Sequence, residues 1–321
     1  MSTPVFQKGA RVALFGDSIT HAGHYPSYLQ QYYLVHLPHL GVKFYNYGAG
    51  GDTAEGALHR RLEYVLRCEP TDVCLMFGVN DIGRALYAPG ATAEKIRERE
   101  DLCRRHLEAT AELCRSFHER GVAVTLCSSL GQDEVFPSAE GYPLSTTGTT
   151  EVLLDLFKRN ADALSGEIAG TVDYFTPMQG LLRDLFSLGG PSLFRDRVHP
   201  TPLGQQLMAR IFLAEQGLPV AVPSAAQLML GWCGEGLIPT IGARYDFEMK
   251  FRNFRWIYPH QAERTAGLSL SERVAYWQNA LAALPDPNDW TATVYRYYIE
   301  NAHRDSEIEA EYFALTDGLY Q

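Results

Sequence analysis

The sequence predicts an α/β fold in which helices cover both faces of a parallel sheet. Short apolar runs alternate with helical stretches over roughly the first 200 residues, which is the pattern of consecutive βαβ units. The runs are continuously apolar rather than alternating, as expected for strands that are buried on both faces. A chain of 321 residues can hold one large domain, or a main domain with an appendage.

Five apolar runs are the expected strands: VALFG (12–16), VKFYN (42–46), DVCLMFG (72–78), GVAVTLCSS (121–129) and TVDYF (171–175). The expected helices lie between and after them, at residues 26–37, 54–67, 92–120, 150–165 and 202–215. The first three strands end in compact polar or glycine-rich clusters, which are Gly16-Asp17-Ser18, NYGAGGDT (46–53) and GVND (78–81). Because ligands of open α/β sheets bind outside the carboxyl ends of the strands, these clusters are expected to meet at one functional edge.

The alternating pattern stops near residues 219–223. The last 101 residues hold all four tryptophans and 16 of the 37 aromatic residues of the chain. We therefore expect a first domain at residues 1–219 and a mostly helical extension at 220–321, with helices at 269–284 and 291–303. The aromatic faces of these helices are expected to pack on the first domain or on a partner subunit in a homo-oligomer, or to fill a core of their own.

Composition and charge exclude several classes of protein. Hydrophobic residues make up 46% and charged residues 21% of the chain, which suits a globular protein rather than a disordered one. A formal net charge of −10 argues against a nucleic-acid partner. The six cysteines form no CxxC pair, the first residues do not resemble a secretion signal, and no run of about 18 apolar residues occurs. We expect a cytoplasmic protein with no membrane partner.

Ser18 is a candidate nucleophile because it follows directly on the first strand. A serine needs a base within hydrogen-bond reach, and the base needs a third group that orients it. Asp196 and His199, in the stretch FRDRVHPT, can supply both, since a carboxylate three residues before a histidine can reach its Nδ1. A surface cap before a helix is the alternative interpretation of this pair.

An acyl-transfer site also needs donors for the developing oxyanion. The backbone N–H of Gly51 and the side-chain amide of Asn80 are candidates, although each residue taken alone is a common turn former. Their occurrence together with Ser18 and the Asp196–His199 pair favours the catalytic interpretation.

The four blocks Gly16-Asp17-Ser18, Asn46-xxxx-Gly51-Asp52, Gly78-x-Asn80-Asp81 and Asp196-xx-His199-Pro200 resemble those of the SGNH (GDSL) hydrolases, a family of esterases, lipases and deacetylases. The resemblance covers about residues 10–215. It implies a flavodoxin-like three-layer α/β/α sandwich. It also implies that Ser18 is the nucleophile, that His199 is the base supported by Asp196, and that the oxyanion hole consists of the Ser18 and Gly51 N–H groups and the Asn80 side chain.

Four further residues, Asp17, His24, Tyr25 and Arg84, are expected to contact substrate. His21 and His24 have HxxH spacing but no third ligand placed with them, so no metal site is expected. The sequence has no phosphate-binding glycine loop, and no cofactor is expected.

The sequences of the blocks resemble those of the carbohydrate-esterase branch more than those of the other branches of the family. The resemblance therefore implies a serine esterase that removes acetyl groups from O-acetylated saccharides. A thioesterase or lysophospholipase is the alternative within enzymes. A non-catalytic sugar-binding or interaction protein is the alternative outside them, although such a protein would have no need of a nucleophile and a base together.

Overall fold

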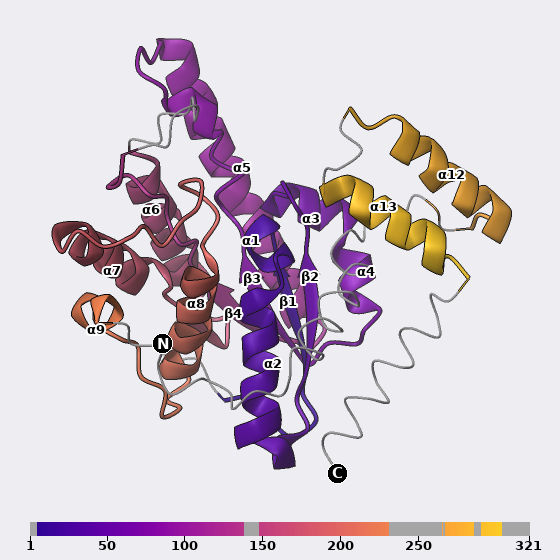
Figure 1. Ribbon diagram of the computed structural model, residues 1–321, viewed down its shortest axis with the longest axis horizontal. Coiled ribbons are helices and arrows are strands. Elements are labelled where there is room, and N and C mark those ends of the chain that lie inside the picture. The colour runs from indigo at the N-terminus through magenta and orange to yellow at the C-terminus, as the bar shows by residue number, and fades with distance from the viewer. Residues whose placement is uncertain (1–4, 138–147, 231–264, 266, 286–289, 304–321) are drawn as a thin grey trace.

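The computed structural model describes residues 5–137, 148–230, 265, 267–285 and 290–303. Its centre is a sheet of five parallel strands, β1 (Arg11–Gly16), β2 (Lys43–Gly48), β3 (Asp72–Met76), β4 (Ala123–Cys127) and β5 (Gly170–Val172). The strand order is β2-β1-β3-β4-β5, which is the flavodoxin-like order. The predicted parallel sheet is thereby confirmed (Figure 1).

Helices lie in front of and behind the sheet (Figure 1). In chain order they are α1 (Ser18–His21), α2 (His24–His36), the 3₁₀ turn η1 (Pro38–Leu40), α3 (Ala54–Arg60), α4 (Leu62–Leu66), the 3₁₀ turn η2 (Arg84–Tyr87), α5 (Ala93–His118), α6 (Thr149–Ala163), α7 (Phe175–Ser187), α8 (Pro202–Glu215), α9 (Ala225–Met229), α12 (Leu270–Ala282) and α13 (Trp290–Asn301). None of the helices in the described part of the chain has both the length and the apolar character that crossing a bilayer requires.

The side chains of β1 alternate between two cores. Val12 and Leu14 belong to a core built with α2, α7 and α8, whereas Ala13 and Phe15 belong to one built with α3, α4, α5 and α6. A strand whose two faces are both buried must be apolar at every position, which explains why the run is continuous. This arrangement gives the three-layer α/β/α sandwich that the resemblance implied.

The short helices α1 and α9 and both 3₁₀ turns were not predicted, and two further regions differ from the predicted elements. The strand expected at 171–175 ends at Val172, and a helix that was not predicted, α7, begins at Phe175. The side chain of Asp173 accepts the Thr176 N–H at 3.0 Å, and this bond satisfies a donor of the first helical turn. The helix expected at 54–67 is interrupted at Arg61, where φ is −127°.

The C-terminal region is helical where it is described, as predicted. In α12, Trp277 is buried and stacks on Tyr298 of α13, with ring centroids 4.8 Å apart. Tyr276 and Tyr295 pack on the same indole. These aromatic side chains therefore form a core between the two helices. The tryptophans at 232 and 256 and the cysteine at 233 lie outside the described residues.

Candidate active site

Ser18 lies at the junction between β1 and α1. Asp17 is the N-cap of α1, and its side chain accepts the Ile19 N–H at 2.9 Å. Ser18 is the first residue of the helix, where a backbone N–H has no intrahelical acceptor. Only glycine fits at position 16, since a Cβ there would come within 2.8 Å of the carbonyl oxygen of Met76. Local geometry thus brings the serine to the carboxyl edge of the sheet.

Three side chains form a continuous chain of hydrogen bonds. The Oγ of Ser18 lies 2.8 Å from Nε2 of His199, and Nδ1 of His199 lies 2.7 Å from Oδ2 of Asp196. The other carboxylate oxygen of Asp196 accepts the His199 backbone N–H at 2.7 Å and the Val198 N–H at 3.2 Å. A base thus touches the serine hydroxyl, and a carboxylate orients the base.

The surroundings of Asp196 keep it ionised. Burial raises the pKa of this carboxyl, but the hydrogen bonds from the ring and backbone of His199 and the charge of that ring lower it by more. The resulting pKa is about 2. A carboxylate that stays charged above this value can stabilise an imidazolium at His199.

A tight loop before α8 places the Asp-His pair. Arg195 donates its N–H to the carbonyl oxygen of His199 at 3.0 Å, and Arg197 has a φ of +65°. Thr201 then caps α8 by accepting the Gly204 N–H at 3.2 Å, and Pro202 occupies the first turn. The loop reverses within a few residues, and this reversal brings the carboxylate of Asp196 back onto the imidazole.

The predicted oxyanion donors lie on two loops that are joined to each other. Asn80 uses one side-chain N–H to donate to the carbonyl oxygen of Asp52 at 2.9 Å. An amide carries two such donors, so the second N–H can serve a ligand. Gly51 is exposed with a φ of +74°, a conformation that favours glycine. Because Gly16 pairs with Gly48 on one side and Met76 on the other, both loops adjoin the turn that carries Ser18.

Two buried carboxylates hold these loops in place. Asp52 accepts from Arg61 at 2.8 Å and from Arg60 at 2.7 Å. Asp81 accepts the Ala54 N–H, at the start of α3, at 2.8 Å. Asp81 thus links the loop after β3 to the segment that follows the loop after β2.

The four predicted substrate contacts differ in placement. Asp17 is 2% exposed and is occupied by capping, and burial, followed by the charges of Asp81 and Asp52, raises its pKa to about 7. Tyr25 is also 2% exposed, and its hydroxyl bonds Thr20 at 2.9 Å. These two side chains pack inside the protein rather than lining an open surface.

The other two side chains are accessible. His24 is exposed at the start of α2, and Arg84 is half-buried at the start of η2. Both can meet a ligand at the edge of the sheet.

His21 supports the loop that carries Gly51, a role that the sequence analysis missed. It is buried, and its Nδ1 accepts the Gly50 N–H at 3.1 Å. A Cβ at Gly48 would lie 2.1 Å from the backbone nitrogen of His21, so the end of β2 packs directly on this residue. The useful sequence signal was a histidine three residues after the nucleophile, together with two glycines that leave room for its close approach.

Known proteins resemble this chain in sequence. The model of the GDSL-like lipase/acylhydrolase family matches residues 14–207. An acetylxylan esterase of Geobacillus stearothermophilus is 25% identical over 225 residues, which are 65% of this chain and 94% of the relative.

Solved structures share the fold. A gut microbial diltiazem-metabolizing enzyme superposes with a TM-score of 0.75 at 16% identity, covering 100% of this chain and 96% of its own. The acetylxylan esterase Axe2 from Geobacillus stearothermophilus gives a TM-score of 0.53 at 22% identity, covering 68% of this chain and 99% of its own.

The family match spans more than half of the chain and contains all four sequence blocks. The chain is accordingly a carboxylic ester hydrolase of the kind that uses a serine nucleophile, and it belongs to the GDSL-like lipase/acylhydrolase family.

Proposed function

We propose that the protein is a serine esterase that removes acetyl groups from O-acetylated saccharides, with Ser18 as its nucleophile. The observation that carries this proposal is the unbroken chain from Ser18 through His199 to Asp196, with both hydrogen bonds shorter than 3 Å. A histidine held in this way has Nδ1 as donor to the carboxylate and Nε2 as acceptor for the serine proton.

The reaction follows from these contacts. As the Oγ of Ser18 attacks the ester carbonyl carbon, Nε2 of His199 takes the hydroxyl proton, and the carbonyl oxygen becomes an oxyanion. That oxyanion accepts from the Ser18 and Gly51 N–H groups and from the free N–H of Asn80. When the tetrahedral intermediate collapses, the bond to the alcohol oxygen breaks, and His199 returns the proton to the departing alcohol.

The second half of the reaction repeats these roles with water. The acyl group remains on Ser18 as an ester, and a water molecule gives its proton to His199 while its oxygen attacks the acyl carbon. Collapse of the second intermediate restores the proton on Ser18 from His199 and releases acetic acid, which loses its own proton to solvent and becomes acetate. Asp196 stays ionised throughout, since its pKa of about 2 lies well below neutral pH.

The substrate class rests on the relatives. The acetylxylan esterase that aligns over 94% of its own length acts on an acetylated saccharide by name. The accessible side chains of His24 and Arg84 are polar, which suits sugar hydroxyls better than a long acyl chain. We therefore expect short acyl groups to be preferred.

Kinetics on a series of p-nitrophenyl esters, together with acetylated xylo-oligosaccharides, tests the proposal. Ser18→Ala should lower kcat on the acetate ester on the order of 10⁴-fold or more, because the triad acts as a unit. Ser116→Ala, at a half-buried position of α5, is the matched control and should retain wild-type turnover. Full activity in Ser18→Ala would exclude the mechanism, and rates that rise from acetate to octanoate would instead favour a lipase-like or thioesterase function.

We also propose that residues 220–321 act as a helical extension that packs on the hydrolase domain or on a second subunit in the cytoplasm. The buried Trp277–Tyr298 stack shows that part of the aromatic surface already serves the contact between α12 and α13. Truncation after Val220 should cause aggregation or a smaller assembly, and should impair hydrolysis of saccharide esters more than of p-nitrophenyl acetate. A soluble truncated protein with unchanged oligomeric state by light scattering and unchanged substrate preference would contradict this role.

A further inference from the structure

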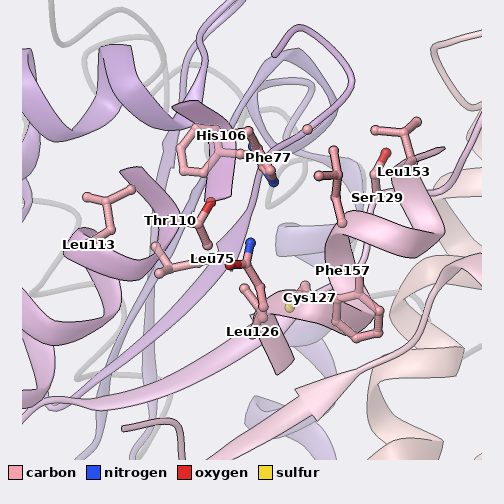
Figure 2. A pocket seen from close by; sticks show the side chains of 13 residues that line it. Leu75, Phe77, His106, Thr110, Leu113, Leu126, Cys127, Ser129, Leu153 and Phe157 are labelled. Atoms are coloured by element: carbon pink, nitrogen blue, oxygen red, sulfur yellow. The ribbon is translucent and has the colours of Figure 1, made fainter. Parts of the chain in front are cut away.

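A small cavity lies behind the loop that carries Asn80. It measures about 20 Å³ and is enclosed by the carboxyl ends of β3 and β4 and by helices α5 and α6. Figure 2 shows the side chains that line it, most of which are apolar. Four lining residues are polar: His106, Thr110, Ser129 and Asn160. Each of these is at most 6% exposed, so four polar side chains line a mostly apolar pocket inside the protein.

Three of the polar groups lack hydrogen bonds. Nδ1 of His106, Oγ1 of Thr110 and Oγ of Ser129 have no hydrogen-bond partner in the part of the chain that the structure describes. Buried polar groups are nearly always paired with protein or ordered water, because an unpaired one keeps its full desolvation cost. A cavity of this volume with several polar groups around it meets the requirements for one bound water molecule.

The imidazole of His106 also faces the Gly78–Asp81 loop, which carries Asn80. Its Nδ1 lies 3.1 Å from Oδ1 of Asp81, close enough for an ionic contact but without the direction of a hydrogen bond. A Cβ at Gly78 would lie 3.8 Å from its Cε1, and both residues line the cavity, so the ring lies beside the first residue of the GVND block. The ring therefore approaches both ends of the Gly78–Asp81 segment, and Asn80 lies between them.

Asp81 extends this contact to the second loop. The Oδ1 atom that His106 approaches is the one that accepts the Ala54 N–H at the start of α3. Asn80 is held on its own side by the carbonyl oxygen of Asp52, two residues before Ala54. A shift of Asp81 would therefore move both the loop that carries Asn80 and the Asp52 carbonyl group to which Asn80 is bonded.

We propose that His106 is a positioning residue, which together with one water molecule bound in this cavity fixes the Gly78–Asp81 loop and thereby aims the side chain of Asn80 at the oxyanion. This inference rests on the proposed function, in which Asn80 is an oxyanion donor. His106 does not touch substrate, and its effect on the reaction passes through Asp81 and Asn80. The water supplies the hydrogen bonds that His106, Thr110 and Ser129 do not obtain from the protein.

The kinetic test replaces His106 with an apolar ring of similar shape. His106→Phe should lower kcat on p-nitrophenyl acetate ~10-fold, which is less than the ~10²–10³-fold expected for loss of a whole oxyanion donor. KM should be nearly unchanged, because the oxyanion forms in the transition state and is absent from the bound substrate. His106→Asn, which keeps a polar group at the position of Nδ1, should recover part of the rate. His118→Phe, on the exposed face of the same helix, is the matched control and should have no effect.

A double-mutant cycle separates positioning from general damage. In an Asn80→Ala background the target of the positioning is gone, so His106→Phe should cause little further loss of kcat. Wild-type kcat in His106→Phe, or an undiminished further loss in the Asn80→Ala background, would overturn the role. If His106→Phe does not fold, His106→Leu takes its place in the same cycle.

The bound water has a separate test that needs no activity. Thr110→Val replaces a hydroxyl by a methyl of the same shape, which destabilises the protein if the hydroxyl binds water and is neutral or stabilising if the hydroxyl is unpaired. We expect a lower urea midpoint for Thr110→Val, and a crystal structure that shows one water within hydrogen-bond distance of at least two of the three groups. A dry cavity, or a Thr110→Val protein as stable as wild type, would refute the water site.

The two sets of measurements keep the proposals apart. Failure of the serine mechanism would appear as full activity in Ser18→Ala, and it would leave the crystallographic water and the midpoint of Thr110→Val unaffected. Failure of the inference would appear in the variants of His106 and Thr110 while Ser18→Ala remained inactive.

Discussion

Replacing Arg61 by methionine should both destabilise the protein and misplace the loop that carries Gly51 and Asp52. The guanidinium is 1% exposed, donates to Oδ2 of Asp52 at 2.8 Å and to the carbonyl oxygen of Tyr47, and lies 5.0 Å above the ring of Phe15. Methionine keeps the apolar stem but provides no donor. Within the described residues, the carboxylate of Asp52 then remains buried with the exposed Arg60 as its one ionic partner.

The magnitude follows from the kind of pair that is broken. Removing one partner of a buried ion pair costs about 3–5 kcal/mol, because the remaining charge stays desolvated. Since Arg60 still contacts Asp52 at 2.7 Å, we expect a loss near the lower end, about 3 kcal/mol. The carbonyl oxygen of Asp52 anchors Asn80, so kcat should fall while KM changes little.

Urea unfolding followed by circular dichroism, with kinetics on p-nitrophenyl acetate, measures both effects. Arg104→Met, which removes exposed ion pairs on the surface of α5, is the matched control and should leave the unfolding midpoint unchanged. Adding Asp52→Asn to Arg61→Met should restore part of the stability, because it removes the negative charge that Asp52 would otherwise keep buried without Arg61. The reasoning is refuted if Arg61→Met is no less stable than Arg104→Met, or if the second substitution destabilises the protein further.

Three other substitutions have expected outcomes. The raised pKa of Asp17 means that the stability contributed by this group is fully present below pH 3.8 and is lost as the pH rises to about 7. The stability of wild type relative to Asp17→Asn should therefore fall across that window. A constant difference in urea midpoint would contradict this. His21→Leu removes the acceptor of the Gly50 N–H and should lower kcat ~10-fold at similar KM. An unchanged kcat would show that the loop that carries Gly51 keeps its conformation without His21. Gly78→Ala places a Cβ at a φ of +135° and 3.1 Å from Leu153, and should cost about 1–3 kcal/mol in urea unfolding; a wild-type midpoint would contradict the strain.

Sequence patterns predicted the fold and the candidate site best where a feature is encoded in a short continuous stretch of residues. The continuous apolar runs predicted a parallel sheet because a strand buried on both faces needs apolar side chains at every position. The blocks around Ser18, Gly51, Asn80 and His199 were recognisable because each is a short turn after a strand or before a helix. Their contacts in the structure, such as the 2.8 Å approach of Ser18 to His199, join segments 181 residues apart.

The remaining features depend on packing that a linear pattern does not encode. The run TVDYF suits a strand or the start of a helix equally well. In the structure, the side-chain oxygens of Ser128 and Asp173 accept the first N–H groups of α7, at 2.9 and 3.0 Å, and these contacts depend on tertiary packing. Tyr25 stands near the nucleophile in sequence but faces the core, because α2 turns it toward Tyr174. His106 was not noticed, although it falls on the buried stripe of α5 together with apolar neighbours. A histidine on such a stripe is the signal that could have singled it out.

The most direct test of the account is covalent capture of the nucleophile. Wild-type protein treated with an alkyl p-nitrophenyl phosphonate should gain the mass of one phosphonyl group, and peptide mapping should place that group on Ser18. Labelling should be abolished by Ser18→Ala and greatly slowed by His199→Ala, because His199 activates the hydroxyl that it contacts at 2.8 Å. An adduct on another residue, or an active wild-type enzyme whose Ser18 remains unlabelled, would contradict the assignment of Ser18 as the nucleophile.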